Sequence, residues 1–495
     1  MATPSAGPGI EDDGHNVLLV VLDTVRRDHV GPYGHDRPTT PTLDRLAAEA
    51  VVYEQAIAQA PWTLPSHASM FTGRYPSQHG ATQESPYLTE DGTLAAALSA
   101  AGYETALYSS NAWLSPHTGV TARFDDHDNT FGPLPGGSSD GVLAGAWQRL
   151  NDGRLQGLAT RLVEWGNVLH ERGSGGTRTP AVIDRTIEFV DATDRWFVAV
   201  NLMDAHLPYR PPEEAKRRFA PDVDPNSVCQ NSKRHNSGAR PIDEAEFADL
   251  RRLYDAEISV ADRELGRLFD HLRSSGVWDD TVVIVCADHG ELHGEFGLFG
   301  HEFAVYDPLV HVPLLLNAPG LDAGRWEAVV ELLDIYDTVL DAATAGDRPE
   351  SVGGRCFDPA RSLLSDVPRT ERPDGDTAFV EYHRPVVELR QLRSKAAEAG
   401  IDPPEEPSRF GSRMRAARRQ NEMYIHNERI PDEARSVTAG ASRALSVEEL
   451  EETRAALARF ESRVGGWAVG GDTGRRLSEM DEDTRERLRN LGYLE

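Results

Sequence analysis

The sequence predicts an α/β fold with a mostly parallel central sheet, helices on both faces of that sheet, and a small C-terminal α+β subdomain. Short apolar runs of strand length alternate with stretches of helical period through most of the 495 residues, which is the pattern of a parallel sheet with covering helices. Polar residues capable of chemistry directly follow several of these runs. Near residues 365–376 the composition shifts toward Pro, Asp and Arg, which indicates a domain boundary.

Five runs are expected to form strands of the central sheet. Each is a short and nearly continuous series of apolar residues, as strands buried on both faces require. They cover residues 17–22, 104–109, 196–202, 281–287 and 312–316.

The clearest expected helix covers residues 244–273, where apolar residues recur every three or four positions in one stripe. Shorter helices are expected at 42–49, 93–101, 180–191 and 331–343. Two stretches rich in Gly, Pro, Ser or Asn, residues 132–141 and 221–240, are expected to be loops.

The C-terminal part is expected to contain a strand at 377–383, a charged helix, a strand at 422–426 and an acidic helix at 446–460. Between the two strands lies an arginine-rich run, residues 409–419, interpreted as an internal ion-pairing segment. The expected organisation is a flexible N-terminal tail (1–15), a large domain (16–365), and a smaller C-terminal subdomain with its tail (366–495).

The charge balance bounds the partners of the protein. Asp and Glu number 80 against 51 Lys and Arg, a formal net charge of −29, and Lys216, Lys233 and Lys395 are the sole lysines. This pattern favours adaptation to high salt, in which screening reduces the repulsion between carboxylates; a GC-rich genome that replaces Lys with Arg is the alternative. The acidity argues against nucleic acid and against an anionic membrane surface as partners.

Apolar run lengths and cysteine usage point to a cytoplasmic protein without a membrane span. The first apolar run, residues 17–22, is too short for an export signal, and no later run reaches spanning length. Cys229, Cys286 and Cys356 are isolated and odd in number, which argues against a disulfide framework or a Cys-based zinc site. The oligomeric state cannot be derived from the sequence.

The residues that follow the predicted strands suggest where the chemistry lies. Asp23 follows the first strand, Asp288 and His289 follow the strand at 281–287, and His206 and Asn111 come shortly after two others. If these strands are parallel neighbours, their carboxyl ends meet at one edge of the sheet. The sequence therefore predicts a metal or catalytic site at that edge.

A second feature is the stretch PWTLPSHASMFTG, residues 61–73, which has the signals of a helix start and stop. Thr63 suits the N-cap, Pro65 the first turn, and Gly73 the C-terminal end. Helix N-termini bind anions, so Thr63 is either an ordinary cap or a nucleophile beside a phosphate or sulfate pocket.

Seven stretches, in their order and spacing, resemble the sulfatases and their relatives in the alkaline phosphatase superfamily. The resemblance extends over most of residues 16–345 and reappears at the end of the chain. The stretches are NVLLVVLDTVRRDHVGPYG (16–34), TLPSHASMFTGRYPSQHG (63–80), LYDAEISVADRELGRL (253–268), TVVIVCADHGELHGEFG (281–297), GHE (300–302), LLDIYDTVLDAA (332–343) and LRNLGYL (488–494).

The resemblance implies a metal centre and a nucleophile. Asp23, Asp288 and His289 match the metal ligands of the family. Thr63 matches the nucleophile, whose oxygen also contacts the metal. The implied cofactor is a divalent ion, and Mn, Ca, Mg and Zn are not distinguished by this ligand set.

The resemblance also implies contacts to the substrate. His206, in DAHLPY, is similar to the histidine that touches the sulfate or phosphate oxygens. His301, in GHE, resembles the late Lys or His that contacts the transferred group and the leaving oxygen. His67 takes the arginine position of the sulfatase signature, and Asn111 stands where many sulfatases keep a substrate-binding lysine. Without the resemblance, His206 and His301 could equally be structural.

Departures from the family pattern favour a branch with an unmodified threonine. Formylglycine, the sulfatase nucleophile, is made from Cys or Ser, so Thr63 cannot be its precursor and none is expected. Thr24 replaces the second carboxylate of an Asp-Asp pair, which favours one metal ion over two. The implied relatives include nucleotide pyrophosphatases/phosphodiesterases and lipoteichoic acid synthases.

The predicted function is metal-dependent hydrolysis of phosphate mono- or diesters, or phosphonate esters, through a covalent intermediate on Thr63. A sulfuric ester hydrolase that uses threonine directly, a phosphotransferase or phosphomutase, and a non-catalytic binding protein are the alternatives. The substrate would be a small molecule, or a phosphate or sulfate ester on a glycan or lipid headgroup. Four further residues are expected in structural places: His79 and His293, Cys286 in the core, and Tyr209 in the core or at the pocket.

Overall fold

The computed structural model describes residues 14–129, 177–344, 351–352, 355–365, 375–402, 404–405, 407–438 and 441–467. The expected loop at 132–141, almost all of the expected tail 1–15, most of the boundary stretch 365–376 and the terminal stretch 488–494 lie outside these residues. The division into domains therefore stays a prediction.

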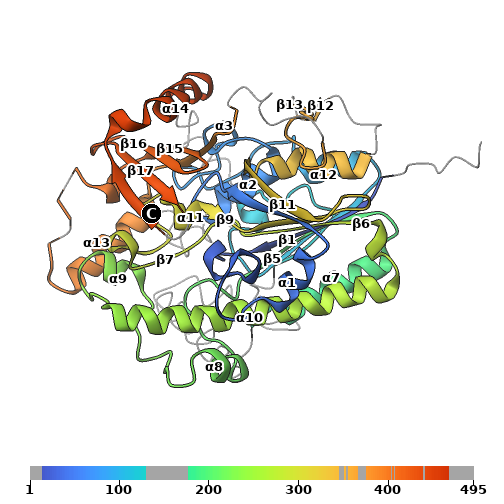
Figure 1. The fold of residues 1–495 in the computed structure, drawn as a ribbon, viewed down its shortest axis with the longest axis horizontal. Helices are drawn as coiled ribbons and strands as arrows, with labels where there is room; N and C mark the ends of the chain where they lie inside the picture. The colour runs from blue at the N-terminus through green and yellow to red at the C-terminus, as the bar shows by residue number, and fades with distance from the viewer. Residues whose placement is uncertain are drawn as a thin grey trace, which may run out of the picture.

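A mixed sheet of nine strands forms the centre of the molecule (Figure 1). Four parallel neighbours lie at its middle: β6 (Thr281–Cys286), β1 (Asn16–Leu22), β5 (Trp196–Leu202) and β3 (Glu104–Ser109). All four are buried almost throughout and match predicted runs to within a residue. On the far side of β3 lies β4 (Asp126–Asn129), also parallel.

The other half of the sheet departs from the prediction. The run 312–316 divides at Pro313 into β9 (His311–Val312) and β10 (Leu314–Asn317), because proline cannot donate to a ladder. β10 is antiparallel to β6 and to β2 (Val51–Ile57), and β2 pairs in parallel with the edge strand β11 (Gly324–Glu331). β2 and β11 have no continuous apolar run, since each carries partly exposed polar residues.

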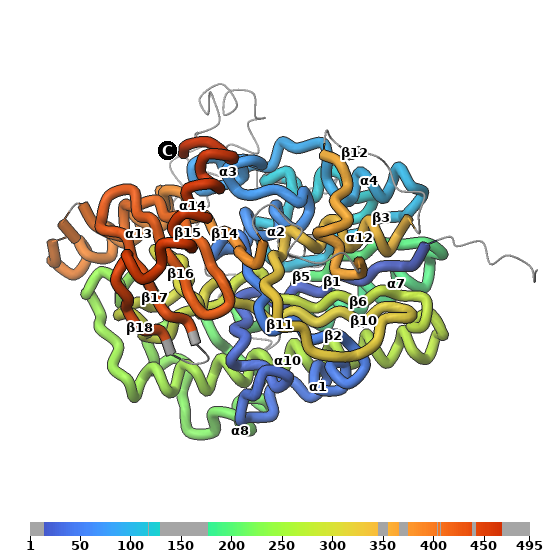
Figure 2. The backbone as a smooth tube through the Cα atoms, turned by 45° about the horizontal axis from the view of Figure 1, so that its top comes forward, coloured from blue at the N-terminus to red at the C-terminus, as the bar shows by residue number. Residues whose placement is uncertain are grey.

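Helices cover both faces of the sheet, as predicted (Figures 1 and 2). On one side α2 (Thr63–Thr72), α4 (Leu94–Ala100) and α12 (Asp334–Thr344) pack together; on the other, α1 (Pro41–Ala47) and α7 (Thr179–Ala192) pack on α10 (Glu244–Ser275). The 32-residue helix α10 starts at its N-cap Asp243 and stops where Gly276 takes a left-handed conformation.

A second sheet, antiparallel and five-stranded, follows in the C-terminal part (Figure 2). Its strands, in order, are β14 (Ala378–Tyr382), β15 (Met414–Arg419), β16 (Glu422–Asn427), β17 (Glu433–Thr438) and β18 (Ala441–Leu445). The helix α13 (Val386–Glu398) follows β14, and α14 (Glu451–Val464) packs on β15 and β16.

The arginine-rich run forms internal ion pairs, which confirms its interpretation. Arg415 and Arg418 of β15 are almost fully buried, and they pair with Glu381 of β14 and Asp307 of the central part at 2.8 and 2.7 Å. The second sheet is thereby tied to the central part through buried charges.

The remaining short elements complete the chain. They are α3 (Pro76–His79), α8 (Glu213–Phe219), α9 (Ser232–Asn236) within the expected loop 221–240, β7 (Leu292–His293), β8 (Phe299–Gly300), α11 (Asp307–Val310), β12 (Ser351–Val352) and β13 (Arg355–Cys356). Among the helices that the structure describes, none has an apolar stretch long enough to cross a bilayer.

Candidate active site

The carboxyl ends of the four central strands bring together the residues predicted to do chemistry. Asp23 directly follows β1, the pair Asp288–His289 lies just beyond β6, and Asn111 lies beyond β3. The strands are parallel neighbours, so their ends share one edge of the sheet. The first turn of α2 reaches the same edge, where Ser66 Oγ donates to the carbonyl of Asp288 at 2.8 Å.

The Asp23 carboxylate is fully buried and only half satisfied. Its Oδ2 accepts hydrogen bonds from the amide groups of Asn111 at 2.8 Å and Asn201 at 3.1 Å. Among the residues that the structure describes, none is a hydrogen-bond partner of its Oδ1. An ionised oxygen without a partner in a buried site is costly, so Asp23 Oδ1 has the character of a metal ligand.

Asp288 and His289 are divided in the same way. Oδ1 of Asp288 accepts from the backbone N–H groups of Thr24 and His289 at 3.2 and 2.9 Å, and its Oδ2 has no hydrogen-bond partner. The Nδ1 of His289 lies 2.9 Å from the carbonyl of Gly290, to which it can donate, and its Nε2 has no partner. That arrangement fixes the tautomer with a bare Nε2, which is the form that binds metals.

These three unsatisfied atoms converge on one point. His289 Nε2 lies 3.5 Å from Asp288 Oδ2 and 4.0 Å from Asp23 Oδ1, and ligand atoms of the three residues lie within 4.8 Å of one another. Burial raises the pKa of Asp288 well above its usual value, and the charge of Asp23 adds to the effect. Burial lowers the pKa of His289. The residues fit a divalent cation, which would satisfy all three atoms and offset the two carboxylate charges.

Thr63 lies beside these ligands as the first residue of α2. The N-cap is Trp62, so the prediction that Thr63 caps the helix is wrong by one residue; Gly73 ends it in a left-handed conformation, as predicted. Thr63 Oγ1 accepts from Asn111 Nδ2 at 3.2 Å, and the same nitrogen lies 2.8 Å from Asp23 Oδ2. One amide thus ties the hydroxyl to the carboxylate, and Thr63 also lines the pocket above the site.

His67 lies one turn further along α2 and is fully buried. Its Nδ1 is 3.0 Å from the carbonyl of Thr63 and 3.6 Å from Asp288 Oδ2, and burial lowers its pKa to about 4. It is therefore a neutral imidazole under the carboxylates, not a residue that lines the pocket. Its expected contact with the transferred group stays a prediction.

His206 and His301 both line the pocket, and their rings meet edge to face with centroids 5.4 Å apart. The ring of His301 also lies 4.6 Å from that of His289. Burial lowers the pKa of His301, but the Glu291 carboxylate, 3.2 Å from its Nδ1, outweighs burial and raises it to about 9. His301 is thus placed as a cationic donor over the metal ligands, and Glu291 orients it.

The pocket has an aromatic and acidic rim. Trp62 and Trp113 meet edge to face at 5.1 Å, and the other lining residues besides Thr63, His206 and His301 are Gln83, Glu302, Tyr382 and Glu388. Tyr382 and Glu388 come from β14 and α13, so the C-terminal part completes the pocket. Lys233 pairs with both Glu302 and Glu388.

Several of these contributors were not predicted. Glu291 lies in the stretch ADHGE that carries the metal ligands, and that position was a usable signal. Asn201, near the end of β5, could not be distinguished from an ordinary buried amide, and Glu388 gave no signal, because only the folded chain brings α13 to the pocket. The expected structural residues are confirmed: His79 Nε2 lies 3.2 Å from Ser69 Oγ, His293 Nε2 lies 2.9 Å from the Tyr209 hydroxyl, and Cys286 is buried in β6.

Comparison with known proteins identifies the family to which the chain is similar. The family model described as Sulfatase matches residues 15–345. Choline-sulfatase of Rhizobium meliloti (strain 1021) is 25% identical over 418 residues, covering 78% of this chain and 79% of its own. The multifunctional alkaline phosphatase superfamily protein PehA of Trinickia caryophylli is 27% identical over 401 residues, with 70% and 76% covered.

A solved structure shares the fold. Phosphonate monoester hydrolase of Agrobacterium radiobacter superimposes with a TM-score of 0.59 at 21% identity, covering 96% of this chain and 96% of its own. Since the family model spans most of the sequence, the protein belongs to the sulfatase family, hydrolases of the alkaline phosphatase superfamily.

Proposed function

We propose that this protein hydrolyses phosphate mono- or diesters, or phosphonate esters, with Thr63 as the nucleophile and one divalent ion held by Asp23, Asp288 and His289. The observation that carries the proposal is the shared amide of Asn111, 2.8 Å from Asp23 Oδ2 and 3.2 Å from Thr63 Oγ1. It holds the hydroxyl against the carboxylate whose other oxygen is unsatisfied.

The residues divide the chemistry between them. A bound divalent ion would lower the pKa of the Thr63 hydroxyl and offset charge on the substrate oxygens. Thr63 Oγ1, after losing its proton to solvent, attacks phosphorus as the alkoxide, and the bond from phosphorus to the leaving oxygen breaks. His301 donates a proton to that leaving oxygen, with Glu291 holding its Nδ1 side. Water then attacks phosphorus and gives a proton back to His301, and the bond from Thr63 Oγ1 to phosphorus breaks, which restores the alkoxide and releases the product.

The identity of the nucleophile favours phosphorus over sulfur. A threonine hydroxyl cannot be converted into the aldehyde hydrate that the sulfatase resemblance implies. It forms an ordinary ester instead, and the proposed reaction is completed when water attacks the phosphorus of that ester. A relative named as a multifunctional alkaline phosphatase superfamily protein and a structural neighbour named as a phosphonate monoester hydrolase support this direction. The similarity to a choline-sulfatase keeps sulfate ester hydrolysis as the rival.

A substrate panel tests the proposal. The protein is loaded in turn with Mn, Ca, Mg or Zn in high salt. It is then assayed on p-nitrophenyl phosphate, bis(p-nitrophenyl) phosphate, p-nitrophenyl phenylphosphonate and p-nitrophenyl sulfate. We expect turnover of phosphorus esters, loss of it in Thr63→Ala, and partial retention in Thr63→Ser. Turnover of the sulfate ester alone would overturn the proposal. Added glycerol tests for transfer, since a phosphoglycerol product would identify a transferase.

The proposal also covers the location of the enzyme, the salt concentration at which it works, and its natural substrate. We infer a cytoplasmic enzyme adapted to high salt, on the strength of the −29 net charge and three lysines. The natural substrate is proposed to be a small molecule, or a phosphate or sulfate ester on a glycan or lipid headgroup.

A further inference from the structure

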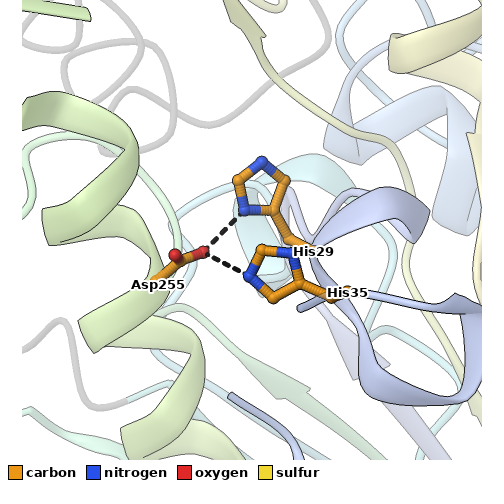
Figure 3. A group of neighbouring side chains, drawn as sticks. All are labelled: His29, His35 and Asp255. Atoms are coloured by element: carbon orange, nitrogen blue, oxygen red, sulfur yellow. Dashed lines mark hydrogen bonds and ion pairs between the residues drawn. The ribbon is translucent and has the colours of Figure 1, made fainter. Parts of the chain in front are cut away.

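A second group of metal-ligating side chains lies apart from the active site (Figure 3). His29 ends a short turn after β1, His35 lies a few residues further along, and Asp255 projects from α10 toward both rings. Ligand atoms of the three residues lie within 4.8 Å of one another. The sequence motifs did not identify any of the three as a candidate site residue, and the proposed reaction does not use them.

The two oxygens of the Asp255 carboxylate have different partners. Oδ2 is held at 2.5 Å by the guanidinium of Arg37. Oδ1 lies 2.6 Å from His29 Nδ1 and 3.3 Å from His35 Nε2. The buried His35 Nε2 lacks the alignment of a hydrogen bond.

We propose that His29, His35 and Asp255 form a second site for a divalent metal ion, for which zinc is the best match. Two imidazoles and a carboxylate, with water in the fourth position, are an established type of zinc donor set. Zinc–ligand bonds of about 2.0 Å place tetrahedral ligand atoms roughly 3.3 Å apart. His35 Nε2 and Asp255 Oδ1, 3.3 Å apart, already meet this spacing. His29 Nδ1 and Asp255 Oδ1, 2.6 Å apart, would need to separate by less than one ångström.

Arg37 fits the site as a residue that orients a ligand. By binding Oδ2 it fixes the carboxylate plane and leaves Oδ1 facing the imidazoles, and ligands held in this way by outer partners are typical of metal sites. The same geometry without metal is a hydrogen-bonded ion-pair network. The two differ in one respect that can be measured, because only the metal site binds a stoichiometric ion.

The ion would brace the segment that leads out of the active-site strand. Tyr254, next to Asp255 on α10, accepts from the backbone N–H of Arg26 at 2.8 Å and donates to the carbonyl of Thr24 at 2.6 Å. A metal on His29, His35 and Asp255 would join residues 24–35 to α10 just beyond these bonds. We therefore expect an effect on stability and none on the chemistry itself.

Zinc content measures the proposal directly. The full-length wild type, His35→Ala and a control, His271→Ala, are dialysed against Zn²⁺ and then metal-free buffer, and zinc per chain is counted by mass spectrometry. His271 lies on the same helix as Asp255 and pairs with the exposed Asp191, so His271→Ala removes an imidazole–carboxylate pair outside the proposed site. We expect one fewer zinc ion per chain in His35→Ala, an unchanged number in His271→Ala, and a zinc-induced rise in Tm that only His35→Ala diminishes.

Anomalous diffraction at the zinc edge places the ion, and it separates this site from the one at Asp23. Should His35→Ala fold poorly, His35→Gln keeps the volume and one polar atom while removing the imidazole. Equal zinc content in the wild type and in either His35 variant overturns the proposal and leaves the group as an ion-pair network only.

Discussion

The two amides on Asp23 allow the metal and nucleophile functions of the site to be separated by mutation. Asn111 and Asn201 both donate to Asp23 Oδ2, at 2.8 and 3.1 Å, but only Asn111 is also bonded to Thr63 Oγ1, at 3.2 Å. Replacement of either by Ala removes one hydrogen bond to the carboxylate. Replacement of Asn111 additionally frees the nucleophile.

The magnitudes follow from the kinds of bond lost. Loss of a side chain that hydrogen-bonds to a metal ligand typically lowers metal affinity about 10- to 100-fold, so we expect each variant to bind the divalent ion more weakly by roughly that factor. A bond between neutral groups contributes about 0.5–1.5 kcal/mol. At saturating metal, Asn111→Ala should therefore keep a further defect of roughly 2- to 13-fold in kcat. Asn201→Ala should recover to near the wild-type rate.

Metal titrations of activity measure both quantities at once. kcat and KM are determined for the wild type and the two variants across a series of metal concentrations, with metal affinity checked by calorimetry. Superimposable curves for Asn111→Ala and Asn201→Ala at saturating metal would refute the idea that Asn111 positions the nucleophile. Unchanged metal affinity in both would refute the assignment of Asp23.

Three further outcomes are expected. Thr63→Ala should abolish turnover while the protein still binds its metal, which a measurement of metal content would check. Peptide mass spectrometry of the wild type should find the trapped covalent intermediate on Thr63. Activity of the variant near the wild-type level would exclude Thr63 as nucleophile. Asp307→Asn should cost about 3–5 kcal/mol in urea unfolding at pH 7, because it strands Arg418, which is 1% exposed. Burial raises the pKa of Asp307, but Arg418 outweighs it and lowers that pKa below 3.8. The contribution of the Asp307–Arg418 pair to the free energy of unfolding is therefore present above pH 3.8 and is lost as the pH falls through the lowered pKa. As a control, Arg419→Ala removes pairs at the surface and should cost less than about 1 kcal/mol. Equal costs for the two variants would contradict the argument. Finally, Tm should rise between about 0.1 and 2 M KCl, since the screening length falls from about 10 Å to below 3 Å around a net charge of −29; a flat or falling Tm would remove the case for salt adaptation.

The part of the fold that the sequence predicts well is the part buried on both faces. β1, β3, β5 and β6 are apolar along nearly their whole length, so their runs are visible without any partner. β11 is exposed over its first four residues, and only pairing with β2 makes it a strand. Edge strands of this kind carry little local signal.

The same distinction explains the site. Asp23, Asp288 and His289 were predictable because the ends of parallel strands must meet, and that rule needs only the strand positions. Glu388 belongs to α13, which lies between the first two strands of the second sheet, and its position at the pocket depends on how β14 packs beside β2 and β11. No local pattern in the sequence encodes that packing. Asn201 could be placed near the site but not distinguished from an ordinary buried amide.

Thr24 gives a physical reason for the prediction that this chain holds one metal ion rather than two. It is a β-branched residue with a positive φ of 61°, a conformation that costs on the order of 1–3 kcal/mol. Its backbone is held there by bonds at both ends, from its N–H to Asp288 Oδ1 and to its carbonyl from Tyr254. The strain therefore serves to orient a metal ligand through the backbone.

The side chain of Thr24 is hydrogen-bonded to the backbone, where its Oγ1 donates to the carbonyl of Asp23 at 2.7 Å. A hydroxyl is also a weaker cation ligand than the carboxylate that the family resemblance places here, because it has no charge to offset. A second ion beside Asp23 would thus lack an anionic ligand at the position where one is expected, while the first has two carboxylates and an imidazole already aimed at it.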